Sequence, residues 1–384
     1  MGKKTITTWQ GACIVTGYGV GGTVMTLPGL AKDIGFFWAM VILAAGYALS
    51  LLIALYLADA TLKGRIKTGE NMQALKLFET FLFRGKLKTP LTLTYFVFLA
   101  LIAVSNLAAY VAGGGQLFAA LLPIDSFAVN CIVFYFFAAV VVMLGLKGVA
   151  MSEQLMVILM LGIMGLLSAL SVGRCGNPLP MAVTGGGAAL LRYFGYIMLA
   201  LAAFFAVPQV VEGLDGDSKE IKKALCLGFA LNSLMIVVIS FFTLTVAPGE
   251  LSEMAIIDWT AGLPSWTALV GVIFIIVALL TSFWSISFGF AQIVQQQFRL
   301  PYMVCWAIAT LPSLLFTLFT SSSFRDMLGL AGGLIGILNS LLFIPMYLNS
   351  KKDVPETIMG SFEALPWVIF ITFINLLYAI GCII

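Results

Sequence analysis

Length, composition and charge exclude a soluble protein. Hydrophobic residues make up 61% of the 384 residues, charged residues only 10%, and the mean hydropathy is +1.08. Soluble domains are nearer half apolar and a quarter charged, so we expect an all-α integral membrane protein with many spans. The chain has no histidine, and its six cysteines have no paired spacing, which indicates neither a metal centre nor a disulfide framework.

Apolar runs of about 18 residues or more, the length that crosses a bilayer, predict eleven transmembrane helices. They lie at Ile6–Leu30, Gly35–Leu62, Pro90–Leu122, Phe127–Leu146, Leu155–Val172, Ala188–Val211, Ala224–Val246, Ser265–Ile293, Pro301–Thr320, Met327–Leu348 and Leu365–Ile384. Sixteen lysines and arginines fall on the N-terminal side of the membrane and four on the other side. By the positive-inside rule we expect a multi-pass plasma-membrane protein with its N-terminus in the cytoplasm and its C-terminus outside.

The first span contains Gly17–Tyr18–Gly19–Val20–Gly21–Gly22, with four glycines in six residues. Each glycine weakens a helix interior by about 1 kcal/mol relative to alanine. Backbone groups released from a helix inside lipid must find other partners. The run therefore predicts a helix that is broken halfway across the membrane and offers its backbone to a ligand. Close packing through small residues is the alternative, since Gly17 and Gly21 have the GxxxG spacing.

The sixth span repeats the pattern of the first. Ala203–Pro208 corresponds to Thr23–Pro28, and each segment ends in a proline. Because the two spans are an odd number of crossings apart, the copies would run in opposite directions through the membrane. Matching interruptions of this kind are typical of an inverted repeat with its site at mid-membrane, although two coincidental proline kinks would look the same.

The eighth span carries a small, hydroxyl-rich face. Ala278, Thr281, Ser282 and Ser285 follow at i, i+3, i+4 and i+7 and so share one side of a helix. Two hydroxyls and a backbone carbonyl, facing carbonyls freed at the first break, would suit a bare Na⁺. Alternatively, the hydroxyls bond back to the preceding turn of their own helix.

Charged residues are expected only near the ends of the spans. Asp59, Glu153 and Glu212 are predicted to lie near cytoplasmic ends, and no span has an acidic or basic residue at its middle. This argues against a proton relay and against a strongly charged substrate. A zwitterion fits better, because its carboxylate can take free amides at a break and its ammonium can take carbonyls. The ring of Tyr110 in the third span could close over such a ligand.

With these residues in view, the chain resembles the amino acid/auxin permease family, whose members share the LeuT fold. Gly21–Gly22–Thr23–Val24–Met25–Thr26–Leu27–Pro28 is similar to that family's G-x-G-[IL]-L-x-L-P motif, with Thr23 where the motif has glycine. The resemblance implies a 5+5 inverted repeat with broken helices 1 and 6. Helices 1–5 would occupy residues 1–173, helices 6–10 residues 174–350, and a peripheral eleventh helix residues 351–384.

The resemblance also implies site residues. The amides of Val20, Gly21 and Gly22 would hold a substrate carboxylate, and Ala203, Phe204 and Phe205 would contact the amine and side chain. Further substrate candidates are Thr23, Tyr110 and Ser285. A sodium ion would be held by the carbonyls of Thr16, Gly19 and Ala278 and the hydroxyls of Thr281 and Ser282. Proton-coupled relatives place a lysine near this site, and the fifth span has none, which favours sodium.

The sequence thus predicts a secondary active transporter that moves a neutral L-amino acid with Na⁺ by alternating access. Its expected partners are the amino acid, Na⁺ and the lipid bilayer, with no cofactor beyond the coupling ion and no nucleic acid. No catalytic acid, base or metal cluster lies inside the spans, so an enzyme is not expected. Two alternatives remain open: a proton-coupled permease of the same fold, and a sensor that binds an amino acid without transporting it.

Overall fold

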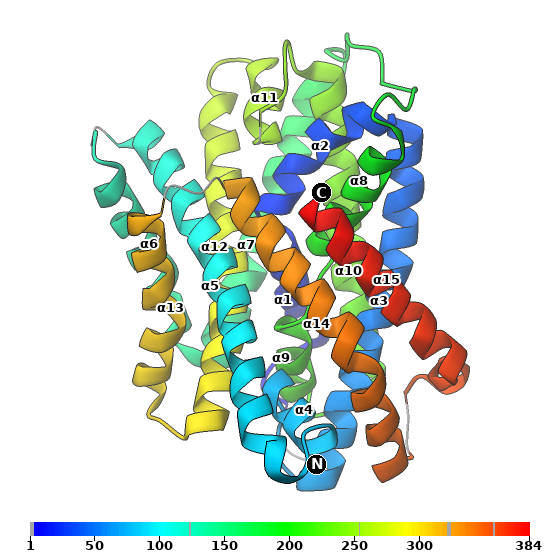
Figure 1. Ribbon diagram of the computed structural model, residues 1–384. Helices are drawn as coiled ribbons and strands as arrows, with labels where there is room; N and C mark the ends of the chain where they lie inside the picture. Colours follow the sequence, from blue (N-terminus) through cyan, green and yellow to red (C-terminus); the bar gives the residue numbers. More distant parts are fainter. Residues whose placement is uncertain (1–3, 123, 253, 321–323, 356–357) are drawn as a thin grey trace.

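The computed structural model describes residues 4–122, 124–252, 254–320, 324–355 and 358–384. Throughout these ranges the regular structure is helical (Figure 1). The α-helices are α1 (Thr8–Gly19), α2 (Gly22–Ile34), α3 (Phe36–Thr68), α4 (Ala74–Phe81), α5 (Lys88–Leu121), α6 (Phe127–Val142), α7 (Gly145–Ser171), α8 (Gly186–Ala200), α9 (Ala206–Gly213), α10 (Ser218–Val246), α11 (Ala255–Ala261), α12 (Thr267–Phe298), α13 (Tyr302–Phe319), α14 (Phe324–Asp353) and α15 (Leu365–Ile383). Short 3₁₀ turns lie at Gly85–Leu87 and Gly360–Glu363.

Long apolar helices make up most of the molecule. Seven helices in the described part are long and apolar enough to cross a membrane, and the count rises to nine if each of two bent pairs is one span. Helix α6 is apolar but shorter, and α8 and α9 are two short pieces. The predicted total of eleven spans therefore stays a prediction.

Both predicted helix breaks are confirmed. Helix α1 ends at Gly19 and α2 begins at Gly22, with a bend of 56° between them. In the sixth predicted span, α8 ends at Ala200 and α9 begins at Ala206, which leaves residues 201–205 outside regular helix. Each break falls in the segment that the glycine run or the proline-terminated motif had indicated.

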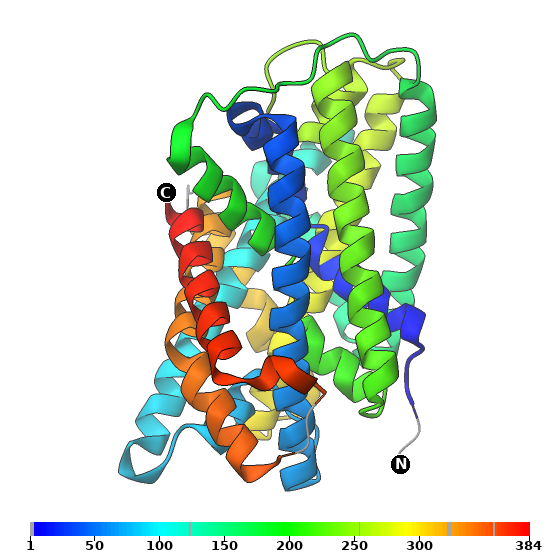
Figure 2. The ribbon, with the colours of Figure 1, turned by 90° about the vertical axis from the view of Figure 1, so that its right-hand side faces the viewer.

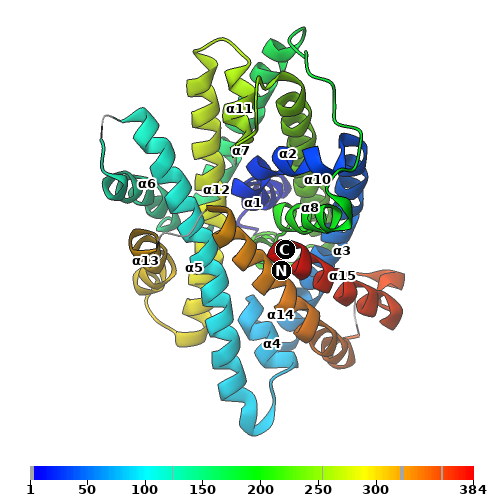
Figure 3. The same cartoon turned by 45° about the horizontal axis from the view of Figure 1, so that its top comes forward.

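Helix α1 is the innermost element. Every residue from Gly11 to Gly19 is buried, and α1 packs against α7, α9, α10 and α12. With the top of the molecule turned towards the viewer, α1 lies near the centre of the bundle, and α6 and α13 lie at one edge (Figure 3). Those edge helices expose large apolar side chains such as Phe136 and Leu315, which suits contact with lipid. The buried glycine run thus lies where backbone groups can face a protein-lined interior.

Helix α15 is less peripheral than its place outside the ten-helix repeat suggests. It runs beside α14 and reaches α8 (Figure 2). The tenth-span glycines allow this approach, because a Cβ at Gly336 would lie 2.8 Å from the Cβ of Ala379. Gly381 and Gly195 bring the backbones of α15 and α8 into contact in the same way. Small residues here permit close helix packing.

Candidate functional site

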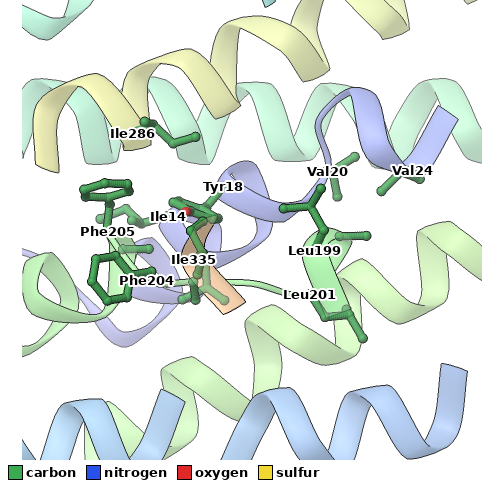
Figure 4. Packing of buried hydrophobic residues seen from close by; sticks show 14 of the residues in the cluster. Ile14, Tyr18, Val20, Val24, Leu199, Leu201, Phe204, Phe205, Ile286 and Ile335 are labelled. Atoms are coloured by element: carbon green, nitrogen blue, oxygen red, sulfur yellow. The ribbon is translucent and has the colours of Figure 1, made fainter. Parts of the chain in front are cut away.

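The two helix breaks face each other at the centre of the bundle. In Figure 4, Tyr18 and Val20 of the first break lie across from Leu201, Phe204 and Phe205 of the second. The rings of Phe204 and Phe205 meet edge to face, with centroids 5.2 Å apart. The Tyr18 hydroxyl reaches the backbone of Phe205. The non-helical segments of the two predicted repeats therefore form one buried site.

The start of α2 is the part of this site suited to an anion. The Val20 N–H donates to the Thr16 carbonyl at 2.9 Å, and the Gly21 N–H donates to the Gly19 carbonyl at 2.8 Å. These two of the three amides predicted to hold a carboxylate thus already have partners. Gly22 and Thr23 occupy the first turn of α2, where N–H groups have no intrahelical acceptor, and no side chain caps that turn.

Two hydroxyls converge on the same point. A Cβ built on Gly21 would lie 2.6 Å from Ser282 Oγ and 3.1 Å from the hydroxyl oxygen of Tyr110. Tyr110 comes from α5 and is buried. A helix N-terminus with hydroxyl donors beside it is a favourable place for a carboxylate.

The second break supplies carbonyl groups and aromatic surface. The Ala203 carbonyl accepts from the N–H groups of Ala206 and Val207. Gln209 Nε2 donates to the Phe205 carbonyl and to the Ser285 carbonyl, both at 2.8 Å, and so fixes the start of α9 to α12. Ala203, Phe204 and Phe205 are all buried at the centre, where they were predicted to contact a substrate.

A cavity continues from the second break towards α15, and the sequence analysis did not find this part of the site. Its wall includes Ala203 and Phe204 together with Ser50 of α3 and Asn375 and Tyr378 of α15. The Tyr378 hydroxyl is buried without a hydrogen-bond partner among the described residues. It lies within electrostatic reach of the hydroxyls of Tyr18 and Tyr110. Tyr378 therefore places a hydroxyl from α15 at the wall of this cavity.

The predicted sodium ligands are only partly brought together. Ser282 Oγ donates to the Gly17 carbonyl at 2.8 Å and lies 3.3 Å from that of Tyr18, so α12 satisfies the free carbonyl end of α1. Thr281 Oγ1 donates to the Ala278 carbonyl, one turn back in its own helix. The carbonyls of the other two candidates, Thr16 and Gly19, accept the Val20 N–H at 2.9 Å and the Gly21 N–H at 2.8 Å.

One prediction about charge is wrong. Glu153 does not lie at the end of a span; it is 0% exposed, and its carboxyl reaches between α1 and α12. Oε1 accepts a hydrogen bond from Ser285 Oγ at 2.7 Å, and Oε2 rests against Gly17. The error came from the span boundary, because α7 begins at Gly145 and not at Leu155, which puts Glu153 more than two turns inside the helix.

The end of the bundle that carries α4 is closed by a polar network. Gln292 Nε2 of α12 donates to Glu212 Oε2 of α9 at 3.0 Å, and Gln73 Nε2 donates to Gln292 Oε1 at 3.0 Å. Gln296 Nε2 reaches the Asn71 carbonyl at 2.6 Å. These bonds tie α9 and α12 to the segment that leads into α4.

The sequence and fold can now be placed among known proteins. The profile of the tryptophan/tyrosine permease family matches residues 4–383. The chain belongs to this family. A search of curated proteins finds no significant match to this permease. The family that matches is thus not the amino acid/auxin permease family that the motif resembled, and that finer assignment is not confirmed.

Three solved transporters resemble this permease in structure. MhsT in complex with L-phenylalanine has a TM-score of 0.65 at 13% identity, covering 99% of this chain and 100% of that chain. Mhp1, a nucleobase-cation-symport-1 family transporter in a closed conformation with bromovinylhydantoin bound, has a TM-score of 0.63 at 14% identity over 99% and 90%. A Na⁺-coupled sialic acid symporter, in a substrate-bound outward-open state, has a TM-score of 0.62 at 14% identity over 98% and 88%. The shared feature is the LeuT fold, as predicted.

Proposed function

We propose that this permease is a secondary symporter that carries a neutral L-amino acid with a cation by alternating access. The observation that carries the proposal is the meeting of two broken helices at one buried site. There, the start of α2 is suited to a carboxylate, and the backbone carbonyls of α1 and of residues 201–205 are suited to an ammonium group.

An aromatic amino acid is the substrate we propose. The name of the family supports it, and MhsT, a transporter of the same fold, was solved with L-phenylalanine. In this chain, Phe204 and the cavity that continues to Tyr378 offer a flat apolar wall with a hydroxyl at its far end. Such a wall suits a ring that carries a polar group, as in tyrosine or tryptophan.

Two coupling cations are candidates. Sodium would use Ala278, Thr281 and Ser282 together with the carbonyls of Thr16 and Gly19, as the sequence analysis expected. A proton is favoured by the buried carboxyl of Glu153, which lies beside the same stripe of α12.

Uptake into proteoliposomes tests the function. The purified permease should accumulate labelled L-tryptophan, L-tyrosine or L-phenylalanine when an inward cation gradient is imposed, and accumulation should collapse when the gradient is dissipated. Replacement of Na⁺ by choline separates the two cations, and Thr281→Ala should raise the sodium requirement if sodium is the driver. Saturable binding without accumulation under any gradient would contradict transport and favour a sensor.

We also propose that the N-terminus is cytoplasmic, that the C-terminus is outside, and that the protein lies in the plasma membrane, on the strength of the lysine and arginine distribution. Native Cys175, exposed between α7 and α8, would then face outwards. A membrane-impermeant maleimide added to intact cells should label the wild type and not Cys175→Ser. Labelling only after the cells are opened would reverse the orientation.

A further inference from the structure

Among the described residues, Glu153 is buried without a cationic partner. Its nearest recorded polar contact is Ser285, and Oε2 has no hydrogen-bond partner among the described residues. The helices that pack most closely on α7 are α1, α6, α10 and α12. Of these, α1, α6 and α12 contain no Asp, Glu, Lys or Arg.

The titratable groups on the surrounding helices do not neutralise it. Helix α1 presents the Cys13 thiol, which lies within electrostatic reach of Glu153, and its Tyr18 hydroxyl reaches the Phe205 backbone instead. On α6, Tyr135 is hydrogen-bonded to Thr310 and Cys131 is packed against Gly115. The charged groups of α10 all lie in its first two turns, at Lys219, Glu220, Lys222 and Lys223, and Cys226 follows one turn later. Helix α7 itself adds only Lys147, which is exposed.

The carboxyl also faces the negative end of a helix dipole. Helix α1 ends at Gly19, and Gly17, whose carbonyl is among those left without an intrahelical donor, is the residue against which Glu153 Oε2 packs. An ionised carboxylate here would be desolvated and would lie near the negative end of that dipole. The site therefore demands either a proton on Glu153 or a cation beside it.

The packing leaves a proton as the better choice. Glu153 Oε2 lies so close to Gly17 that a Cβ there would overlap it, while Oε1 is bonded to Ser285. Ser282 and Thr281 are bonded directly to backbone carbonyls and are not held apart around a common centre. Of the five oxygens predicted to hold sodium, Thr281 Oγ1 and the Ala278 carbonyl are bonded to each other, and Ser282 Oγ and the carbonyls of Thr16 and Gly19 have other protein partners.

We propose that Glu153 is the proton-carrying residue of this permease, and that Ser285 transmits its protonation state to α1. The proposal rests on the symport function proposed above. One proton adds to the Glu153 carboxylate on the side of higher proton activity, travels with the substrate, and leaves from the same carboxyl on the other side. No other bond is formed or broken.

The coupling follows from the single proton of the Ser285 hydroxyl. Ser285 Oγ lies 2.7 Å from Glu153 Oε1 and 3.3 Å from the Ile14 carbonyl of α1. When Glu153 is ionised, Ser285 donates to the carboxylate, because a charged acceptor is stronger. When Glu153 is protonated, the carboxyl donates to Ser285 Oγ and the serine proton turns to Ile14. Protonation thereby joins α1 to α12, and α1 is one half of the helix that forms the substrate site. Any difference this makes to substrate affinity must appear equally in proton affinity.

The test measures proton uptake and substrate binding separately. Purified wild type in weakly buffered detergent, with a pH-indicator dye, should take up close to one proton for each labelled aromatic amino acid bound above neutral pH. Glu153→Gln, an uncharged carboxamide of the same shape, should bind substrate with no proton uptake and with an affinity independent of pH. Glu153→Asp should restore proton uptake with a displaced pH profile. Glu79→Gln is the matched control, because Glu79 pairs with Lys76 and Lys88 at one end of the bundle; it should behave as the wild type.

In proteoliposomes, an inward proton gradient should stimulate wild-type accumulation at least 10-fold, and Glu153→Gln should reduce that stimulation to about 1-fold while exchange of internal for external substrate persists. Normal proton stimulation in Glu153→Gln would overturn the proposal. A second result would also overturn it: wild-type accumulation that depends on Na⁺ and not on the proton gradient, together with loss of that sodium dependence in Glu153→Gln. Glu153 would then be a sodium ligand. If the wild type accumulates no amino acid under any gradient, the proposed symport function is wrong. The dye measurement still tests the proton-carrying role of Glu153, because it needs only substrate binding and not transport.

Discussion

Replacement of Gly17 by alanine tests the contact between Glu153 and the broken helix. A Cβ at this position would overlap Glu153 Oε2 and lie 3.0 Å from the Cβ of Thr281. The carboxyl is the far end of a flexible side chain and could swing aside, but it would then lose the hydrogen bond from Ser285. Overpacking, or a lost buried hydrogen bond, costs about 1–3 kcal/mol.

Gly29 provides the matched control, because it lies in α2 of the same broken span and a Cβ there would meet nothing within 4 Å. Both substitutions gain the preference of alanine over glycine in a helix, about 1 kcal/mol. The difference between the two variants therefore isolates the contact at Gly17. We expect Gly17→Ala to be less stable than Gly29→Ala by about 1–3 kcal/mol, or roughly 5- to 150-fold in the unfolding equilibrium constant.

SDS titration in mixed micelles gives the free energy of unfolding of Gly17→Ala and of Gly29→Ala. A double-mutant cycle with Glu153→Ala then shows how much of the difference comes from the contact with Glu153. In the Glu153→Ala background, the penalty of Gly17→Ala should fall to the smaller contact with Thr281. Equal stability of Gly17→Ala and Gly29→Ala, or a penalty unchanged by Glu153→Ala, would refute the position assigned to the carboxyl.

Three further substitutions test other parts of the site. Tyr378→Phe removes the unpartnered hydroxyl of the cavity, so the KM for tyrosine or tryptophan should rise about 2- to 10-fold while that for phenylalanine stays constant; Tyr95→Phe, whose ring packs on the aromatic residues of α4, should change neither. Ser282→Ala leaves the carbonyl end of α1 unsatisfied and should lower the free energy of unfolding by about 0.6–1.7 kcal/mol in the same SDS titration. Gln73→Ala removes the side-chain bonds to Glu212 of α9 and Gln292 of α12, so amide hydrogen exchange in α9 should be faster than in the wild type. Equal exchange rates in the variant and the wild type would show that these bonds do not stabilise α9.

The helix breaks could be predicted because their cause is local. Glycines at 17, 19, 21 and 22 weaken a helix whatever surrounds it, and a proline-terminated motif in the sixth span repeats the first. The same holds for the shared face of Thr281, Ser282 and Ser285, which follows from helical spacing alone, and the structure turns that face towards α1.

Contacts that depend on which helices become neighbours could not be predicted. Apolar run length placed the start of the fifth span at Leu155, although Val149 and Ala150 just before Glu153 are buried apolar residues that continue the helix. A fifth span extended towards the N-terminus to include Val149 and Ala150 would have placed Glu153 inside the membrane. Tyr378 did carry a signal that went unused, because Asn375 and Tyr378 stand at i and i+3 in an otherwise apolar helix and both line the cavity.

A break two residues long explains how substrate and cation can share one element. Helix α1 ends at Gly19, and α2 begins at Gly22 with N–H groups that have no intrahelical acceptor, so the negative end of one dipole and the positive end of the other lie side by side. Ser282 contacts both sides, since it donates to the Gly17 carbonyl and lies next to Gly21. A carboxylate at the start of α2 would lie at the positive end of that helix dipole, and Glu153 packs against the last turn of α1. Both interactions depend on the same few peptide groups, so a shift of α1 that improves one interaction alters the geometry of the other, and this is the condition for coupled binding.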